Sequence, residues 1–199
     1  MKGEDKGNPE QSTPLTVLPL TKARWNDFTT LFGEQGACEG CWCMFWRIRH
    51  KEYQTGRGEI NRDKMKSLVE RGVVPGLIGY LHEEPIAWIS LAPREEYIRL
   101  ETSKILSPVD ESPNLWSIVC LFIAKPWRRK GYSVPLIRAA VQYAFSKGAK
   151  VVEAYPFDIE KKEPDSWVFT GIAKMYRSAG FEEVLRRSPR RPIMRFSCS

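Results

Sequence analysis

The chain has 199 residues, of which 42% are hydrophobic and 12% aromatic, which suits one domain with a packed core and argues against wholesale disorder. It contains no apolar run of the roughly 20 residues that span a bilayer, and its polar start resembles no secretory signal. We therefore expect a cytoplasmic protein with no membrane partner.

The formal charge of +7 predicts an anionic partner. Nucleic-acid binding is not expected, because aromatic residues are not interleaved with the basic clusters as on a base-stacking surface.

The first half of the chain predicts a tail, a strand and two helices. Residues 1–14 are polar and predict a flexible tail, which leaves 15–199 as one folded domain. Residues 16–20 form a short β-compatible run, and Thr21 can cap a helix over 22–32. The glycine-containing stretch 53–62 is expected to be a mobile loop, followed by a helix over 64–71.

From residue 75 onward, strands and helices alternate. Two strands over 77–82 and 85–91 flank a turn that suits a hairpin. The uncharged run over 115–123 predicts a central buried strand. The remaining predicted elements, in chain order, are a helix at 133–147, a strand at 151–155, a helix at 172–179, and strands at 182–186 and 192–196. Their sum predicts one mixed α/β (α+β) domain.

The most informative segment follows the predicted central strand. Pro126 lacks the amide hydrogen that a sheet ladder needs, so the strand must end near it. Three cations and Gly131 come next, and glycine lets the backbone approach a phosphate closely. The helix start at Ser133 offers unpaired N–H groups at the positive end of the helix dipole. The segment predicts a pyrophosphate-binding turn, the alternative being an ordinary basic turn with solvated side chains.

Two motifs resemble those of the GNAT N-acetyltransferase superfamily. Arg128, Gly131 and Ser133 are similar to its acetyl-CoA signature, Arg/Gln-x-x-Gly-x-Gly/Ala, with serine as the last small residue. The stretch 173–181, Ala-Lys-Met-Tyr-Arg-Ser-Ala-Gly-Phe, resembles its Ala-x-x-x-Tyr-x-x-x-Gly-Phe segment, with the alanine shifted by one residue. The resemblance covers the element order over 75–196. It implies a GNAT-like single domain whose central, mixed, largely antiparallel twisted sheet is flanked by helices.

The resemblance also implies the reaction and the donor site. Acetyl-CoA would be the co-substrate, and its acetyl group would pass directly to a primary amine of a small molecule or peptide. A non-catalytic acyl-CoA-binding or sensing module is the alternative, and the sequence leaves monomer and homodimer open. The backbone of Leu121, Phe122 and Ile123 would contact the acyl-pantetheine arm. The residues implied to cradle the pyrophosphate are Arg128, Arg129, Lys130, Gly131, Tyr132 and Ser133.

Candidates for proton transfer are unequal in strength. Tyr176 matches the tyrosine that protonates the departing CoA thiolate in the superfamily, and a tyrosine pKa near ~10 exceeds that of a thiol. A structural tyrosine that packs its helix is the alternative. No carboxylate lies on the central strand, so the general base is not predicted. Carboxylates that could act through a water, or could simply be solvated charges, are Glu95, Glu96, Glu101, Glu153 and Asp158.

A cysteine-rich aromatic segment follows the first helix. Cys38, Cys41 and Cys43, with His50 nearby, could supply zinc ligands, but they lack the distant second pair of most structural zinc sites. We expect no metal and favour small thiols buried among aromatic side chains. The segment over 40–44 resembles Gly-Cys-Trp-Cys-Met segments of uncharacterised bacterial members of the superfamily. In GNAT enzymes this region often walls the acceptor pocket, which makes acceptor-binding candidates of Trp42, Trp46 and Arg47.

Overall fold

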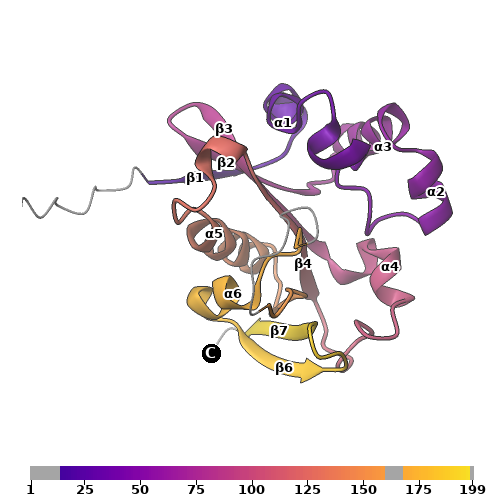
Figure 1. The fold of residues 1–199 in the computed structure, drawn as a ribbon, viewed down its shortest axis with the longest axis vertical. Helices are drawn as coiled ribbons and strands as arrows, with labels where there is room; N and C mark the ends of the chain where they lie inside the picture. Colours follow the sequence, from indigo (N-terminus) through magenta and orange to yellow (C-terminus); the bar gives the residue numbers. More distant parts are fainter. Residues whose placement is uncertain (1–13, 160–167, 198–199) are drawn as a thin grey trace, which may run out of the picture.

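The computed structural model describes residues 14–159 and 168–197, which form a seven-stranded sheet with helices packed on it (Figure 1). Along the sheet the strands run in the order β1-β2-β3-β4-β5-β7-β6. They are β1 (Thr16–Pro19), β2 (Gly76–Leu81), β3 (Glu84–Pro93), β4 (Leu115–Ile123), β5 (Val151–Ala154), β6 (Glu182–Arg186) and β7 (Pro192–Ser197). Neighbouring strands are antiparallel except β4 and β5, which are parallel. This arrangement confirms the predicted mixed, largely antiparallel sheet.

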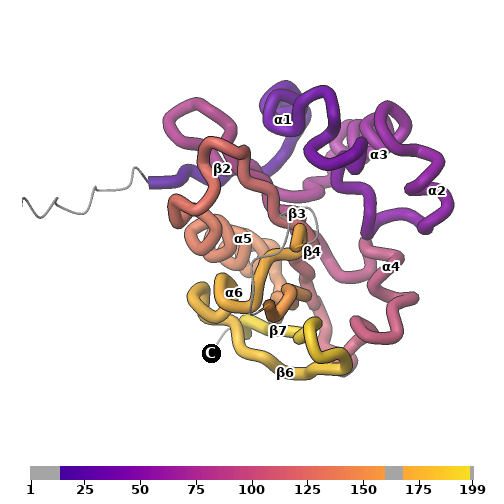
Figure 2. Tube along the Cα trace, in the orientation of Figure 1, coloured from indigo at the N-terminus to yellow at the C-terminus, as the bar shows by residue number. Residues whose placement is uncertain are grey.

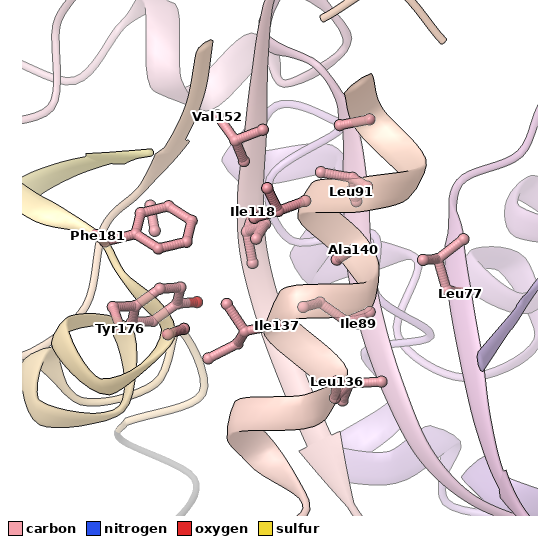
Figure 3. Packing of buried hydrophobic residues seen from close by; sticks show 14 of the residues in the cluster. Leu77, Ile89, Leu91, Ile118, Leu136, Ile137, Ala140, Val152, Tyr176 and Phe181 are labelled. Atoms are coloured by element: carbon pink, nitrogen blue, oxygen red, sulfur yellow. The ribbon is translucent and has the colours of Figure 1, made fainter. Parts of the chain in front are cut away.

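Helices cover both faces of the sheet. They are α1 (Trp25–Phe32), α2 (His50–Thr55), α3 (Glu59–Glu70), α4 (Ile98–Glu101), α5 (Ser133–Ser146) and α6 (Ala173–Ala179). Helices α5 and α6 lie together over one face, where Ile89 and Ile118 of the sheet pack against Ile137 of α5 (Figures 2 and 3). Helices α1 and α3 cover the opposite face, over the side chains of Ile78 and Trp88. No helix in the described ranges has the length and apolar character needed to cross a bilayer.

The prediction of a mobile loop over 53–62 is wrong, because most of this stretch is helical. Helix α2 extends to Thr55 and α3 begins at Glu59, earlier than the predicted start of the second helix. The glycines serve close packing here: a Cβ on Gly40 would meet the amide nitrogen of Gly58 at 2.3 Å. Buried Asn61 donates from its amide to the carbonyl oxygens of Gly40 and Tyr53. Long-range packing thus overrides the local signal. The predicted tail, apart from Pro14, lies outside the described residues.

Strand β4 is irregular in its middle. Its pairing with β3 shifts between Ser90 and Leu91, so that Val119 is the extra residue of a β-bulge. Its pairing with β5 ends at Ile118 and Ala154. Beyond Ile118 the second half of β4 therefore pairs with β3 on one side and leaves its other edge to a different part of the chain.

Candidate active site

The turn between β4 and α5 has a backbone suited to an anion. Arg129 and Gly131 have φ values of 63° and 87°, both in the left-handed region. Such residues let successive N–H groups point toward one concave site. Helix α5 begins at Ser133, and the side chain of its N-cap residue, Tyr132, makes no capping hydrogen bond. Its first-turn amides and the positive end of its dipole are therefore available to a phosphate group.

The three basic side chains of the turn differ in their exposure to solvent. Arg129 and Lys130 are exposed, whereas Arg128 is partly buried. The Nε of Arg128 donates to the carbonyl oxygen of Ile123 at 2.8 Å, and its guanidinium lies 5.8 Å from the ring centre of Phe122. Arg128 thus folds back onto the end of β4, while the exposed Lys130 places its ammonium 4.9 Å from the ring centre of Trp127. The residues present at this turn fit a pyrophosphate group.

Beyond Ile118, the edge of β4 that faces away from β3 is occupied by another segment of the chain. The amide of Leu121 donates a 2.7 Å hydrogen bond to the carbonyl oxygen of Phe169. The ring of Phe169 is held by Phe45 and Trp46, at centroid distances of 5.4 Å and 6.4 Å. An extended ligand can pair with this edge only if residues 168–170 give up that bond.

Tyr176 is fully buried beside the same segment. Its hydroxyl donates to the carbonyl oxygen of Thr170 at 3.1 Å, and its ring packs edge-on against Phe181. Figure 3 shows the hydroxyl directed away from α6, toward Ile137 and β4. Burial raises the pKa of Tyr176 well above its usual value. The hydroxyl therefore keeps its proton over the whole physiological range.

Glu153 is not the solvated charge that its sequence position suggested. It is fully buried on β5 and accepts hydrogen bonds from the Tyr155 hydroxyl at 2.7 Å and the Arg195 Nε at 2.8 Å. Arg94 lies 3.6 Å from the same carboxylate. With its oxygens engaged by these cations, Glu153 belongs to an internal ion-pair network. That environment does not suit a general base.

The other carboxylates proposed as bases lie nearer the surface. Asp158 pairs with Arg177 and Arg186, at 3.3 Å and 2.6 Å. Glu101 is 3.1 Å from Arg94, and Glu96 is 3.2 Å from Arg47. Glu95 and Glu101 line a groove of about 530 Å³ beside Leu115, at the start of β4. That groove lies at the opposite end of β4 from the β4–α5 turn.

The three acceptor-binding candidates are buried. Trp42 packs with Phe28 and Phe32 under the sheet. Arg47 donates to the carbonyl oxygen of Pro75 and pairs with Glu96. Trp46 lies against Phe169, and its buried indole nitrogen has no hydrogen-bond partner among the residues that the structure describes.

The three cysteines considered as zinc ligands differ in how exposed they are. Cys38 is exposed, Cys41 is partly exposed and Cys43 is buried. In the described ranges, no three His, Cys, Asp or Glu side chains gather as metal ligands do. Cys43 instead contacts Cys120 of β4 and Trp88 of β3. Sequence reasoning missed this contact, since nothing in the local pattern links residues so far apart along the chain.

A family model described as "Acetyltransferase (GNAT) family" matches residues 39–169. The match spans more than half of the chain, which therefore belongs to the GNAT acetyltransferase family. A search of curated protein sequences finds no match.

Solved structures of the same fold agree with this assignment. The PaiA N-acetyltransferase from Thermoplasma acidophilum, solved with coenzyme A, is 11% identical, with a TM-score of 0.52 over 92% of this chain and 99% of its own. A putative GNAT acetyltransferase from Desulfovibrio desulfuricans is 12% identical, with a TM-score of 0.52 over 92% and 98%. The aminoglycoside acetyltransferase AAC(6')-Ib, solved with coenzyme A and kanamycin, is 17% identical, with a TM-score of 0.53 over 92% and 94%. At these identities the likeness establishes the fold.

Proposed function

We propose that this protein is an acyl-CoA-dependent N-acyltransferase that passes an acetyl group from acetyl-CoA directly to a primary amine. The observation that carries the proposal is the basic, left-handed turn that follows β4 and opens helix α5. Membership of the GNAT acetyltransferase family supports the donor. The relatives solved with coenzyme A, one of them also with kanamycin, support a CoA donor and a small-molecule amine acceptor.

The chain's own groups have three tasks in this reaction. The turn over 128–133 holds the pyrophosphate through backbone amides, with Arg129 and Lys130 adding positive charge. The second half of β4 orients the acyl-pantetheine arm once the Leu121 amide is released from Phe169. A strand amide then polarises the thioester carbonyl as negative charge develops on its oxygen.

Tyr176 is the proton donor in this proposal. The amine attacks the thioester carbonyl, the carbon–sulfur bond breaks, and the departing thiolate takes the phenolic proton. Burial raises the pKa of Tyr176, so the phenol is protonated when the donor binds, and exposure of the hydroxyl as residues 168–170 detach lowers the cost of giving up that proton. The contact with Thr170 holds the hydroxyl close to the segment that covers β4. The acceptor amine loses its own proton to solvent, because Glu153 is locked between arginines.

A second candidate is a non-catalytic acyl-CoA-binding or sensing module. The sequence of β4 carries no carboxylate, and its edge is closed by the chain itself. Calorimetry with acetyl-CoA, followed by release of free thiol across a library of small amines and peptides, tests both proposals. Amine-dependent thiol release supports the transferase. Binding without turnover with any amine supports the sensing module, and no binding at millimolar acetyl-CoA contradicts both.

A further inference from the structure

Two cysteines from distant parts of the chain meet between the sheet and the cysteine-rich segment. Cys43 belongs to the core cluster against which Cys120 of β4 packs, and the two thiols interact. The indole Nε1 of Trp88 donates to the same Cys43 sulfur at 3.2 Å. Cys43 is buried, Trp88 is fully buried, and Cys120 is partly exposed. The Cys43 sulfur is therefore buried and accepts a hydrogen bond from Trp88, whereas Cys120 lies nearer the solvent.

The backbone that presents Cys43 is strained. Trp42 and Cys43 have consecutive φ values of 45° and 58°, in the left-handed region that non-glycine residues seldom adopt. Such conformations are costly, and they gather where a side chain must be held in one orientation. The surrounding core thus holds the Cys43 sulfur against Trp88 and Cys120.

This environment separates the two thiols chemically. The interaction with Cys120, helped by Trp88 and Ser90, outweighs burial and lowers the pKa of Cys43 below its usual value. The same contact, together with burial, raises the pKa of Cys120 well above its usual value. Of the two sulfurs, Cys43 is therefore the one that loses its proton first. A sulfenic acid on it would lie beside the second thiol with which it can condense to a disulfide.

We propose that Cys43 and Cys120 are a peroxide-reactive dithiol that closes reversibly into an internal disulfide. In the first step the Cys43 thiolate attacks one oxygen of hydrogen peroxide, the O–O bond breaks and hydroxide leaves, so that Cys43 becomes a sulfenic acid. In the second step the sulfur of Cys120 attacks the Cys43 sulfur, the S–O bond breaks and water leaves with the thiol proton. Two thiols and one peroxide thus yield one disulfide and two waters.

The neighbouring cysteines lack this arrangement. Burial raises the pKa of Cys41, although Tyr53 and the backbone of Phe45 and Cys43 interact with its sulfur. Cys38 is exposed on the turn over 36–40. These two residues are therefore internal controls for simple thiol accessibility. The proposed oxidation does not depend on acetyl transfer, so its test stands apart from that of the enzyme activity.

The first test uses a folded chain that keeps only the pair. In the variant Cys38→Ser, Cys41→Ser, Cys198→Ser, a small excess of hydrogen peroxide should remove two hydrogen atoms from the intact mass. Peptide mapping without reductant should then show Cys43 linked to Cys120, and dithiothreitol should reverse the link. Unlinked sulfinic acids, or no reaction, would overturn the proposal. In the wild-type chain, a Cys41–Cys43 link in place of Cys43–Cys120 would overturn it as well.

The second test asks which sulfur attacks. Because the pKa of Cys43 is lowered, the oxidation rate should rise with pH around a midpoint below the ~8.5 of an ordinary thiol. Cys120→Ser should leave Cys43 as a sulfenic acid that a dimedone probe traps. Cys43→Ser should slow the oxidation of Cys120 by about tenfold or more. Equal rates in the two variants, or a midpoint above pH 8.5, would contradict the assignment.

Discussion

The amide of Leu121 is bonded to the carbonyl oxygen of Phe169 at 2.7 Å, and the next carbonyl along the chain, that of Thr170, accepts the hydroxyl of Tyr176 at 3.1 Å. One short segment therefore engages both the strand edge proposed for the donor and the proposed proton donor. Binding of the pantetheine arm along β4 requires this segment to detach. Detachment would release the Tyr176 hydroxyl in the same step, so that donor binding and proton-donor availability are coupled.

We expect Phe169→Ala to strengthen acetyl-CoA binding. The ring anchors the segment through edge-on contact with Phe45 and tilted contact with Trp46, and such aromatic pairs contribute about 0.5–1.5 kcal/mol each. Removing the anchor lowers the cost of freeing β4, which should tighten the calorimetric Kd by roughly fivefold. Val168→Ala is the matched control and should leave the Kd unchanged. Weaker binding by the Phe169 variant would show that the ring supports the donor site.

A glycine pair tests the phosphate-binding turn. Gly131 and Gly72 have φ values of 87° and 83°, and a Cβ at either position would meet no atom within 4 Å. Alanine at either site should therefore cost about 1 kcal/mol of stability through backbone strain alone. Only Gly131→Ala should also weaken acetyl-CoA binding, by about tenfold, because it disturbs the amides that face the pyrophosphate. Thermal unfolding and calorimetry on both variants separate the two effects, and equal Kd values would remove the turn from the donor site.

The sequence predicted those elements whose signal is local. Strand β4 has the predicted bounds, because an uncharged β-forming run is closed by Pro126, and α5 has the predicted start because its apolar stripe is regular. Helix α3 was predicted too short because Gly58 looks like a loop residue until its packing against Gly40 is known. The Leu121–Phe169 bond and the Cys43–Cys120 contact join segments far apart in the chain. No periodicity or spacing encodes either contact, so neither could be read from the sequence.

Tyr176→Phe should lower turnover while leaving acetyl-CoA affinity nearly unchanged. Loss of a general acid costs about 10²–10⁴-fold in rate where proton transfer limits the reaction. The lost bond to Thr170 should also cost roughly 1 kcal/mol of stability. Steady-state kinetics at saturating acetyl-CoA measure the first effect. Tyr143→Phe, a half-buried tyrosine on α5, is the control. If both variants turn over like wild type, Tyr176 has only a packing role.

Glu153→Gln should destabilise the fold rather than abolish the chemistry. The buried carboxylate accepts hydrogen bonds from Tyr155 and Arg195 and lies near Arg94. Removing the buried charge leaves Arg94 and Arg195 with the half-exposed carboxylates of Glu101 and Asp110, at a cost of about 3 kcal/mol, the low end for a broken buried pair. Urea unfolding should show this loss, whereas Glu101→Gln, whose carboxylate is half exposed, should have a small effect. Unchanged stability with lost turnover would instead restore Glu153 as a candidate base.

Stability in acid should depend on Asp110. The guanidinium of Arg195 donates to both carboxylate oxygens of Asp110, at 2.6 Å and 2.9 Å. The hydrogen bonds from Arg195 and Ser112 hold the pKa of the Asp110 carboxyl well below its usual value. A folded-state pKa below the unfolded value stabilises the fold above the unfolded pKa of ~3.9, and that stabilisation is lost as pH falls through the folded pKa. Asp110→Asn should therefore lower stability at pH 7 and flatten its decline below about pH 4. Because Asp110 is half exposed, both effects should shrink in high salt.

Glu111→Gln, an exposed neighbour, makes the same change in formal charge, and chemical unfolding between pH 2 and 7 should give it the acid profile of wild type. A wild-type profile for Asp110→Asn would mean that the ion pair contributes nothing to the fold.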